Sequence, residues 1–423
     1  MDGMNNPWTN ELMETEDELL AEMREEFRRR LQIRLQRSLD ARQQGMAEVS
    51  SLARKRKVDL TLKTTLGWIV LRATKGYCTE RQEWIVPIRE AWGLDKHQRL
   101  SPSLQRKLCC TAVETGSFEK AATLASEWGS SVSDDTIRSC VVALGEKALT
   151  APISTDGSEK AGPDDVLVIM MDGWMARHRG KDWGIQKRAD GQERIHWHEI
   201  KSAIIYRLKD QVHISRKRRA LLAKHVVAVP AETDPVEFGR RVHAEARRMG
   251  LGKAKFVYVV MDGGIWLWNI FEDRFKQCAI GTLDFYHASQ HIHALATELF
   301  QGNKQQAGTW CAKILHSLRH QSTRKLFSTL EELLIAPPRP DDSTTSAIQE
   351  AKDYFDSHRN HMDYPAATRA GLPIGSGSME SQCSQFQNRF KRRGQFWTKK
   401  GFAALLEVAV RHQNRELNSL WAA

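Results

Sequence analysis

Three acidic residues are candidates for chemistry, and two of them stand at the ends of apolar runs, where a carboxylate is costly unless it is paired or binds a metal. Asp172 follows the apolar run "VLVIMM" and Asp262 follows "KFVYVVM", and a glycine comes after each. Unbroken apolar runs are typical of strands buried on both faces, so two such motifs favour a functional role over ordinary strand-ending turns. The third acid, Glu380, lies in "GSGSMESQCSQFQNRFKRRGQ", where a Gly-Ser start leads into a strongly basic helix.

Acids in this arrangement suit metal-dependent phosphoryl transfer on nucleic acid. Two divalent ions about 3.5–4 Å apart activate the attacking oxygen and stabilise the leaving oxygen. Because Mg²⁺ prefers carboxylate oxygens, we predict that Asp172, Asp262 and Glu380 are catalytic and bind two Mg²⁺, for which Mn²⁺ can substitute. Asp284 is an alternative second acid, and in that case Asp262 is a turn residue.

A sheet must position these acids, and the chain after residue 165 predicts one. Strands are expected at 166–171, 195–206, 225–229, 255–261 and 277–283, with a helix at 234–250 before the fourth. This is the order of a ribonuclease H-like sheet. Helical periodicity follows from 287 to about 370. In the closing helix, Met379, Cys383, Phe386 and Phe390 form an apolar stripe expected to face the sheet.

The N-terminal third predicts mainly helix. Residues 10–57 are expected to form an amphipathic, partly basic helix that packs on its own protein or on a second subunit. A short β-like piece lies within 60–90, and three helices lie within 101–150, the last capped by Ser133 or Asp134. This arrangement favours a helix-turn-helix DNA-binding region, and a plain three-helix bundle is the alternative.

The predicted fold class is therefore α/β. It comprises a ribonuclease H-like core with a mixed five-stranded sheet, an α-helical insertion and an N-terminal, mainly helical DNA-binding region. The predicted segments are an N-terminal helix (1–58), the helix-turn-helix region (59–150), a linker (151–165), the core (166–287), the insertion (288–371) and the part of the core with the Glu380 helix (372–423).

Charge points to a polyanionic partner. The chain has 423 residues, and 63 Lys and Arg outnumber 52 Asp and Glu, giving a formal net charge of +11. Nucleic acid is the first candidate partner for such a surface. The residues predicted to contact DNA are Arg138, Arg216, Lys217, Arg218, Arg219, Arg389, Lys391, Arg392 and Arg393.

Cysteine usage and hydropathy bear on the compartment. The seven cysteines are scattered without a C-x-x-C pair, which argues against a disulfide framework or a zinc knuckle. The N-terminus lacks an apolar signal core, and no stretch approaches the roughly 20 apolar residues of a membrane span. We expect a cytoplasmic, nucleoid-associated bacterial protein that does not contact membranes.

The three acids resemble the DDE triad of prokaryotic insertion-sequence transposases. Asp284 and His287, in "TLDFYHASQHI", match the D-x-x-H signature of Mutator-like transposases and their bacterial relatives, and "GSGSMES" is similar to the Kra-type insertion-sequence group. The resemblance implies hydrolysis at transposon ends followed by strand transfer into target DNA. Asp284 and His287 would lie beside the site and position DNA.

The same resemblance implies the partners. These are double-stranded DNA, as transposon ends and as target, and further copies of the chain, at least a dimer in the synaptic complex. Two alternatives remain. One is a transposase-derived DNA-binding protein without catalytic activity, and the other is a different ribonuclease H-like nuclease.

Overall fold

A computed structural model describes residues 7–150, 161–180, 196–215, 218–339 and 341–421. The chain divides into two compact units, one formed by residues 1–148 with 415–423 and the other by residues 149–414. Most of the predicted linker, residues 151–160, lies outside the described residues. None of the helices in the described ranges combines the length and apolarity that a membrane crossing requires.

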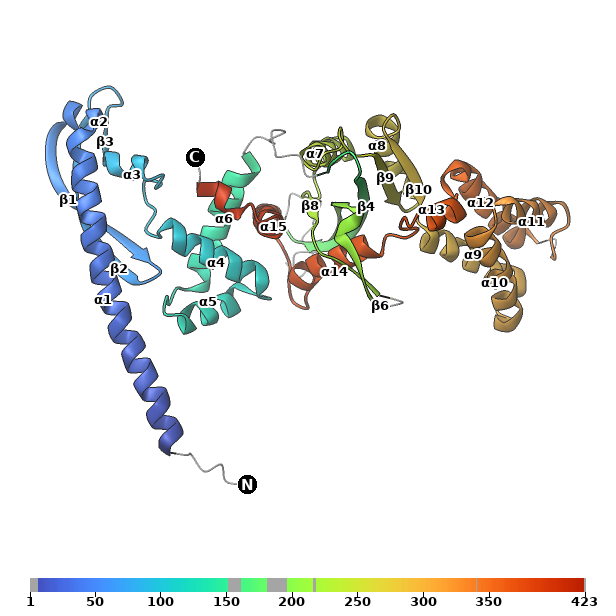
Figure 1. Cartoon of the computed structure of the whole chain (residues 1–423), viewed down its shortest axis with the longest axis horizontal. Helices are drawn as coiled ribbons and strands as arrows, with labels where there is room; N and C mark the ends of the chain where they lie inside the picture. The colour runs from blue at the N-terminus through green and yellow to red at the C-terminus, as the bar shows by residue number, and fades with distance from the viewer. Residues whose placement is uncertain (1–6, 151–160, 181–195, 216–217, 340, 422–423) are drawn as a thin grey trace, which may run out of the picture. The chain divides into compact units, whose positions relative to one another are not determined.

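The first unit contains a three-stranded antiparallel sheet in the order β1-β2-β3 (Figure 1). Thr64 pairs with Gly67 across the turn between β1 and β2, and Gly67 has a φ of 118°, a conformation that glycine adopts without steric cost. Apolar side chains of both strands alternate inward onto helix α1, so one face of the sheet is buried. The elements are α1 (Pro7–Gly45), α2 (Ala47–Ser51), β1 (Ala53–Thr64), β2 (Gly67–Cys78), β3 (Glu83–Ile85) and α3 (Pro87–Ala91).

Helix α1 lies along the edge of β2 and takes over part of its hydrogen bonding. The side-chain amide of Gln36 accepts a hydrogen bond from the backbone N–H of Arg72 at 2.8 Å and donates one to the carbonyl oxygen of Arg72 at 3.3 Å. Thr74 donates its hydroxyl to Gln43 at 3.0 Å. The helix therefore stands where a further strand would pair.

The predicted helix over residues 10–57 is wrong at its end. Residues from Ala53 onward belong to β1, where Lys57 pairs with Thr74 and Val58 with Ala73. The basic run at 54–57 gives no apolar alternation, so only the partner strand identifies it as β structure. The β structure of this region is also longer than the short piece expected within 60–90.

The prediction of three helices within 101–150 is confirmed. They are α4 (Pro102–Glu114), α5 (Phe118–Glu127) and α6 (Asp134–Thr150), and η4 (Leu417–Trp421) returns to this unit. Ser101 and Ser117 cap the first two, and the hydroxyl of Ser133 accepts a hydrogen bond from the backbone N–H of Thr136 at 3.2 Å. These serines satisfy backbone donors that a helix start leaves open.

The second unit is built on a five-stranded mixed sheet in the order β10-β9-β4-β5-β8. β4 pairs antiparallel with β5, and β5 with β8, whereas β4, β9 and β10 run parallel. All five strands fall where the apolar runs predict them, but β4 continues past its expected end at residue 171, so Asp172 lies within the strand rather than at its end. Their bounds are β4 (Val166–His178), β5 (His196–Arg207), β8 (His225–Ala228), β9 (Phe256–Met261) and β10 (Ala279–Leu283), with the β6 (Gln211–Ser215) and β7 (Arg218–Leu221) hairpin between β5 and β8.

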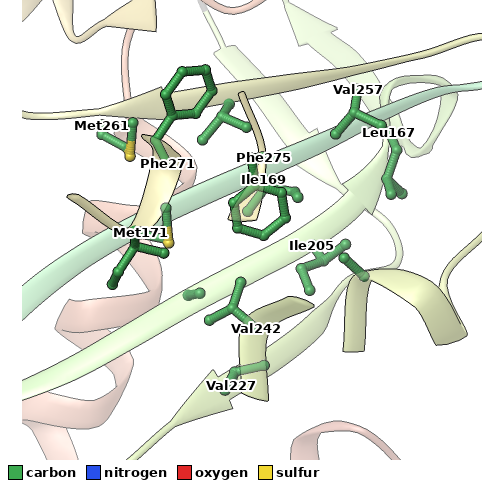
Figure 2. Close-up of a cluster of buried hydrophobic side chains, with 14 of the residues drawn as sticks. Leu167, Ile169, Met171, Ile205, Val227, Val242, Val257, Met261, Phe271 and Phe275 are labelled. Carbon is green, nitrogen blue, oxygen red and sulfur yellow. The ribbon is translucent and has the colours of Figure 1, made fainter. Parts of the chain in front are cut away.

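Helices cover both faces of this sheet. On one face, side chains such as Ile169, Met171 and Met261 pack with Phe271 and Phe275 (Figure 2). Those helices are α7 (Pro235–Arg248) and α8 (Ile265–Arg274). On the other face lie α14 (Gly377–Phe390) and α15 (Lys399–Gln413), with α14 against β4 and β5 and α15 against β8.

The segment between β10 and α14 is helical, as predicted, and has a core of its own. Tyr364 and Phe355 are fully buried there, and Leu283 at the end of β10 contributes to the same cluster. The helices are α9 (Phe285–Phe300), α10 (Lys304–His320), α11 (Arg324–Ile335), α12 (Asp342–Ser357) and α13 (Tyr364–Arg369).

Substitution of Phe238 tests the packing of α7 on the sheet. Its side chain is fully buried and meets Trp266 edge to face at 5.9 Å. We expect Phe238→Ala to lower the free energy of unfolding of this unit by about 3–5 kcal/mol, because the cavity adds to the lost burial. Val236→Ala, on the same helix at 65% exposure, is the control and should change it by less than about 0.5 kcal/mol. Denaturant titration measures both, and equal effects would contradict this packing.

Candidate active site

Asp172 lies on the central strand and points to the α14 face. Side chains alternate along β4, so Met171 joins the core on the α7 side while Asp172 and Trp174 face the other way. Trp174 stacks on Phe386 of α14 with ring centroids 5.6 Å apart, and its indole N–H donates to Ser202 of β5 at 2.9 Å. These contacts fix the strand beside the acid.

The environment of Asp172 opposes its ionisation. Burial is the largest influence and raises its pKa to about 6, although the backbone N–H of Gly173 acts in the opposite direction. The carboxylates of Asp262 and Glu380 raise the pKa further, and His287 lowers it. The predicted acids and His287 are therefore close enough to interact electrostatically around Asp172.

Asp262 follows β9 in a turn held from several sides. Its carboxylate accepts a hydrogen bond from the backbone N–H of Gly264 at 2.8 Å, and its carbonyl oxygen accepts one from the Trp268 indole at 2.8 Å. A Cβ on Gly263 would stand 2.4 Å from the ring of Tyr354. The glycine is thus needed for α12 to approach the acid closely.

Glu380 lies in the first turn of α14, on its exposed side. The predicted apolar stripe of this helix is buried: Met379, Cys383, Phe386 and Phe390 are each at most 5% exposed. The Cys383 thiol lies 3.8 Å from Asp172 Oδ2, which brings the helix directly against the central acid. Burial, and next the negative charge of Asp172, raise the pKa of Cys383, so the thiol stays protonated and can donate to the carboxylate.

Asp284 has a different role from the other acids. It is fully buried, and one carboxylate oxygen accepts hydrogen bonds from the backbone N–H groups of Tyr286 and His287, which cap α9. The other oxygen accepts one from the N–H of Ser376 at 2.6 Å, immediately before α14. Asp284 therefore ties the start of α9 to the start of the Glu380 helix.

The close approach between the start of α9 and the start of α14 depends on Gly375. A Cβ there would stand 2.5 Å from the ring of Tyr286. The N–H of Phe285 also donates to the carbonyl oxygen of Ile374 at 2.9 Å. Both carboxylate oxygens of Asp284 accept hydrogen bonds from backbone N–H groups. Of the two candidates for the second acid, this geometry therefore favours Asp262.

The three acids offer the carboxylate oxygens that divalent cations prefer, but they do not form one compact cluster. Among the described residues, the ligand atoms of Asp172, Asp262 and Glu380 do not all lie within 4.8 Å of one another. Two ions about 3.5–4 Å apart need ligands on both sides of a central acid rather than one tight cluster. Burial, and then the negative charges of Asp262 and Glu380, disfavour the ionised form of Asp172, and a nearby cation has the opposite effect on a carboxylate.

Two residues near the acids carry no sequence signal of their own. One is Cys383, which the sequence identifies only as part of the apolar stripe. The other is Tyr354 of α12, whose hydroxyl is buried without a hydrogen-bond partner. Burial is the main cause that raises the pKa of Tyr354, and Asp262 and Asp284 add to it. Tyr354 thus lies close to both acids.

The basic residues predicted to contact DNA separate into groups. Arg389 is a correction: it is 6% exposed, and its guanidinium lies 5.5 Å from the ring of Trp397, so it is not a surface group. Lys391, Arg392 and Arg393, just after α14, are exposed. Burial lowers the pKa of Arg389, as expected for a cation inside the protein.

The remaining basic residues lie elsewhere. Arg138 on α6 is exposed and pairs with Asp135 at 3.0 Å. Arg219 is exposed on β7 and donates to Gln211, which in turn reaches Ser378 in the first turn of α14. Arg218 lies in β7, and Arg216 and Lys217 lie outside the described residues.

Comparison with known proteins gives limited similarity. A model of an uncharacterised protein family, UPF0236, matches residues 7–216, a range that includes Asp172 but not Asp262 or Glu380. No curated protein sequence matches the chain. One solved structure, the Drosophila P element transposase strand transfer complex, matches at 12% identity over 75% of this chain and 79% of that chain, with a TM-score of 0.24. A TM-score at this level does not establish a common fold.

The pKa of Asp172 predicts a pH-dependent stability in metal-free buffer. An unfolded aspartate ionises near pH 3.9, whereas folded Asp172 ionises near pH 6, so the fold loses stability as the pH rises between these values. We expect Asp172→Asn to be more stable than wild type above pH 7, by at most about 3 kcal/mol, and nearly equal near pH 4. Denaturant titration across pH measures the difference. Asp164→Asn, an exposed control, should show none, and a pH-independent difference for Asp172→Asn would contradict the assignment.

Proposed function

We propose that this protein is a metal-dependent DNA transposase of the DDE type. Its activity would be phosphodiester hydrolysis at transposon ends followed by strand transfer into target DNA. The observation that carries the proposal is the half-buried carboxylate of Asp172, on the central strand, with Asp262 and Glu380 close enough to raise its pKa. A carboxylate with a raised pKa beside further charged residues is typical of a functional site.

The sheet supports a ribonuclease H-like core. Three strands, β4, β5 and β8, follow one another antiparallel, and β9 and β10 then add parallel to β4 on its other side. The proposal is supported by the location of Asp172 on the central strand, of Asp262 after its parallel neighbour β9 and of Glu380 on a helix that covers the sheet. The helices between β10 and α14 correspond to the implied insertion.

Asp172, Asp262 and Glu380 would hold two Mg²⁺, which when bound activate the attacking oxygen and stabilise the leaving oxygen. The chain's own residues supply the placement. Asp284 fixes the backbone from which α14 begins, so it sets the position of Glu380 relative to the strands. Cys383 contacts Asp172 and holds the same helix against β4.

Basic residues near these acids would hold the DNA. Lys391, Arg392 and Arg393 are exposed at the end of α14, and exposed lysines and arginines supply phosphate contacts without base specificity. Arg219 reaches toward the start of the same helix through Gln211. His287, one turn into α9, lies close enough to Asp172 to favour its ionised form. DNA that lies along α14 would thus meet the acidic residues at one end of the helix and the basic residues at the other.

Strand cleavage tests the proposal. Purified protein is incubated with Mg²⁺ or Mn²⁺ and a plasmid carrying the DNA that flanks its own gene. We expect nicks at the element ends. Asp172→Asn, Asp262→Asn and Glu380→Gln should each reduce the cleavage rate more than about 100-fold, which exceeds the usual cost of changing a residue that only contacts a metal ligand. All three variants should still shift the DNA on a gel.

Asp284→Asn separates the two possible second acids. Since its carboxylate binds only backbone N–H groups in the structure, we expect lower stability and weakened cleavage. Loss of cleavage with Asp284→Asn but not with Asp262→Asn would move the second acid to Asp284. DNA binding without cleavage in the wild type, with the correct ends present, would overturn the enzymatic proposal in favour of a DNA-binding protein.

Metal binding has a readout apart from cleavage. Mg²⁺ or Mn²⁺ should raise the melting temperature of the wild type, because a ligand that binds only the folded state stabilises it. Asp172→Asn should lose most of that rise, whereas Asp164→Asn should retain it. An equal rise in both variants would place the metal elsewhere.

A further inference from the structure

Helix α1 extends well beyond the sheet on which it packs. Every residue from Trp8 to Met23 is exposed, whereas Leu39, near the other end of the helix, is fully buried. In Figure 1 the N-terminal half of α1 projects past β1 and β2. A helix of this length gains most of its stability from packing, so an exposed half calls for a partner.

The exposed large apolar residues of α1 share one side of the helix. At 100° per residue they fall within an arc of about 160°, on the side opposite Gln36 and Leu39, which face β2. Their exposures run from 45% to 75%. Glu16, Arg30 and Arg34 fall within the same arc, so charged residues are interspersed with the apolar ones. Exposed apolar side chains gathered on one side of a helix are typical of an interaction site. The residues are Trp8, Leu12, Met13, Leu19, Leu20, Met23, Phe27 and Ile33.

The charges of α1 identify the partner. Residues 11–22 contain six acidic and no basic residues, whereas residues 24–37 contain six arginines and two glutamates. A second copy of α1 running antiparallel would bring each acidic stretch alongside the other's basic stretch. A parallel pair would instead align acidic with acidic, which is unfavourable.

The apolar residues match in the same register. With Met23 opposite the partner's Met23, Met13 faces the partner's Ile33 and Leu19 faces the partner's Phe27. The charged Glu16 falls opposite the partner's Arg30. Both groups are exposed, and Arg30 has Glu26 of its own helix beside it at 2.7 Å. The paired stretch, residues 8–37, is about 45 Å long, enough for about four heptads.

We propose that the protein dimerises through α1, as an antiparallel two-helix coiled coil centred on Met23. The inference concerns the oligomeric state and does not depend on the proposed chemistry. It names the surface through which two copies, each with its own set of acids, would be joined.

Charge exchange tests the pairing. Light scattering coupled to gel filtration should give the wild type a mass near 2 × 48.3 = 96.6 kDa. We expect Glu16→Arg, and separately Arg30→Glu, to weaken the dimer about tenfold or more, and the double variant to restore it because each pair is re-formed with reversed signs. A monomeric wild type would overturn the proposal, as would a double variant no better than the single ones.

Cysteine cross-linking tests the direction in a background with exposed Cys278 changed to Ser. Met23→Cys should form a disulfide-linked dimer on mild oxidation, because this position meets itself. Leu12→Cys should not, because it meets the partner's Arg34. Cross-linking at both positions would indicate a parallel pair and overturn the proposal, and cross-linking at neither would place the interface elsewhere. None of these readouts involves cleavage, so they stand apart from the test of the proposed function.

Discussion

The buried carboxylate of Asp284 connects the parts of the second unit on which the site depends. It has no exposed surface, and three backbone N–H groups from two separate segments share its two oxygens. Hydrogen bonds to a charged acceptor are stronger than neutral ones, and in a buried place a missing partner is costly. The end of β10, the start of α9 and the start of α14 are therefore held together, although 92 residues separate Asp284 from Ser376.

The two faces of the sheet differ in the residues that they carry. The α7 face is closed by apolar side chains, as Figure 2 shows, and contributes stability. The α14 face combines aromatic packing around Trp174 with the acids, and the aromatic contacts bring Asp172 into an environment that disfavours its charge. The packing that stabilises the fold thus also buries part of Asp172 and raises its pKa, an effect that a nearby cation would oppose.

Sequence patterns predicted the five strands well, because strands buried on both faces give unbroken apolar runs that no other short element matches here. They also placed Asp262 directly after a strand and Glu380 beside a buried stripe, but Asp172 lies within β4, which continues to His178. They failed where only a distant partner decides. Arg56 and Lys57 belong to a strand because β2 pairs with them, and Arg389 is buried beside Phe390 and Trp397. Tyr354 and Cys383 reach the acids only through packing of segments far apart in the chain.

The amide of Gln36 has a consequence for how the protein behaves at high concentration. An open strand edge is a template on which another chain can add a strand, and that is a common route to aggregation. By bonding both the N–H and the carbonyl oxygen of Arg72, this one side chain imitates a neighbouring strand at the exposed edge of β2. Deamidation to glutamate would remove the donor and leave two acceptors facing each other. Chemical ageing at this one residue would therefore reopen the sheet to misassembly.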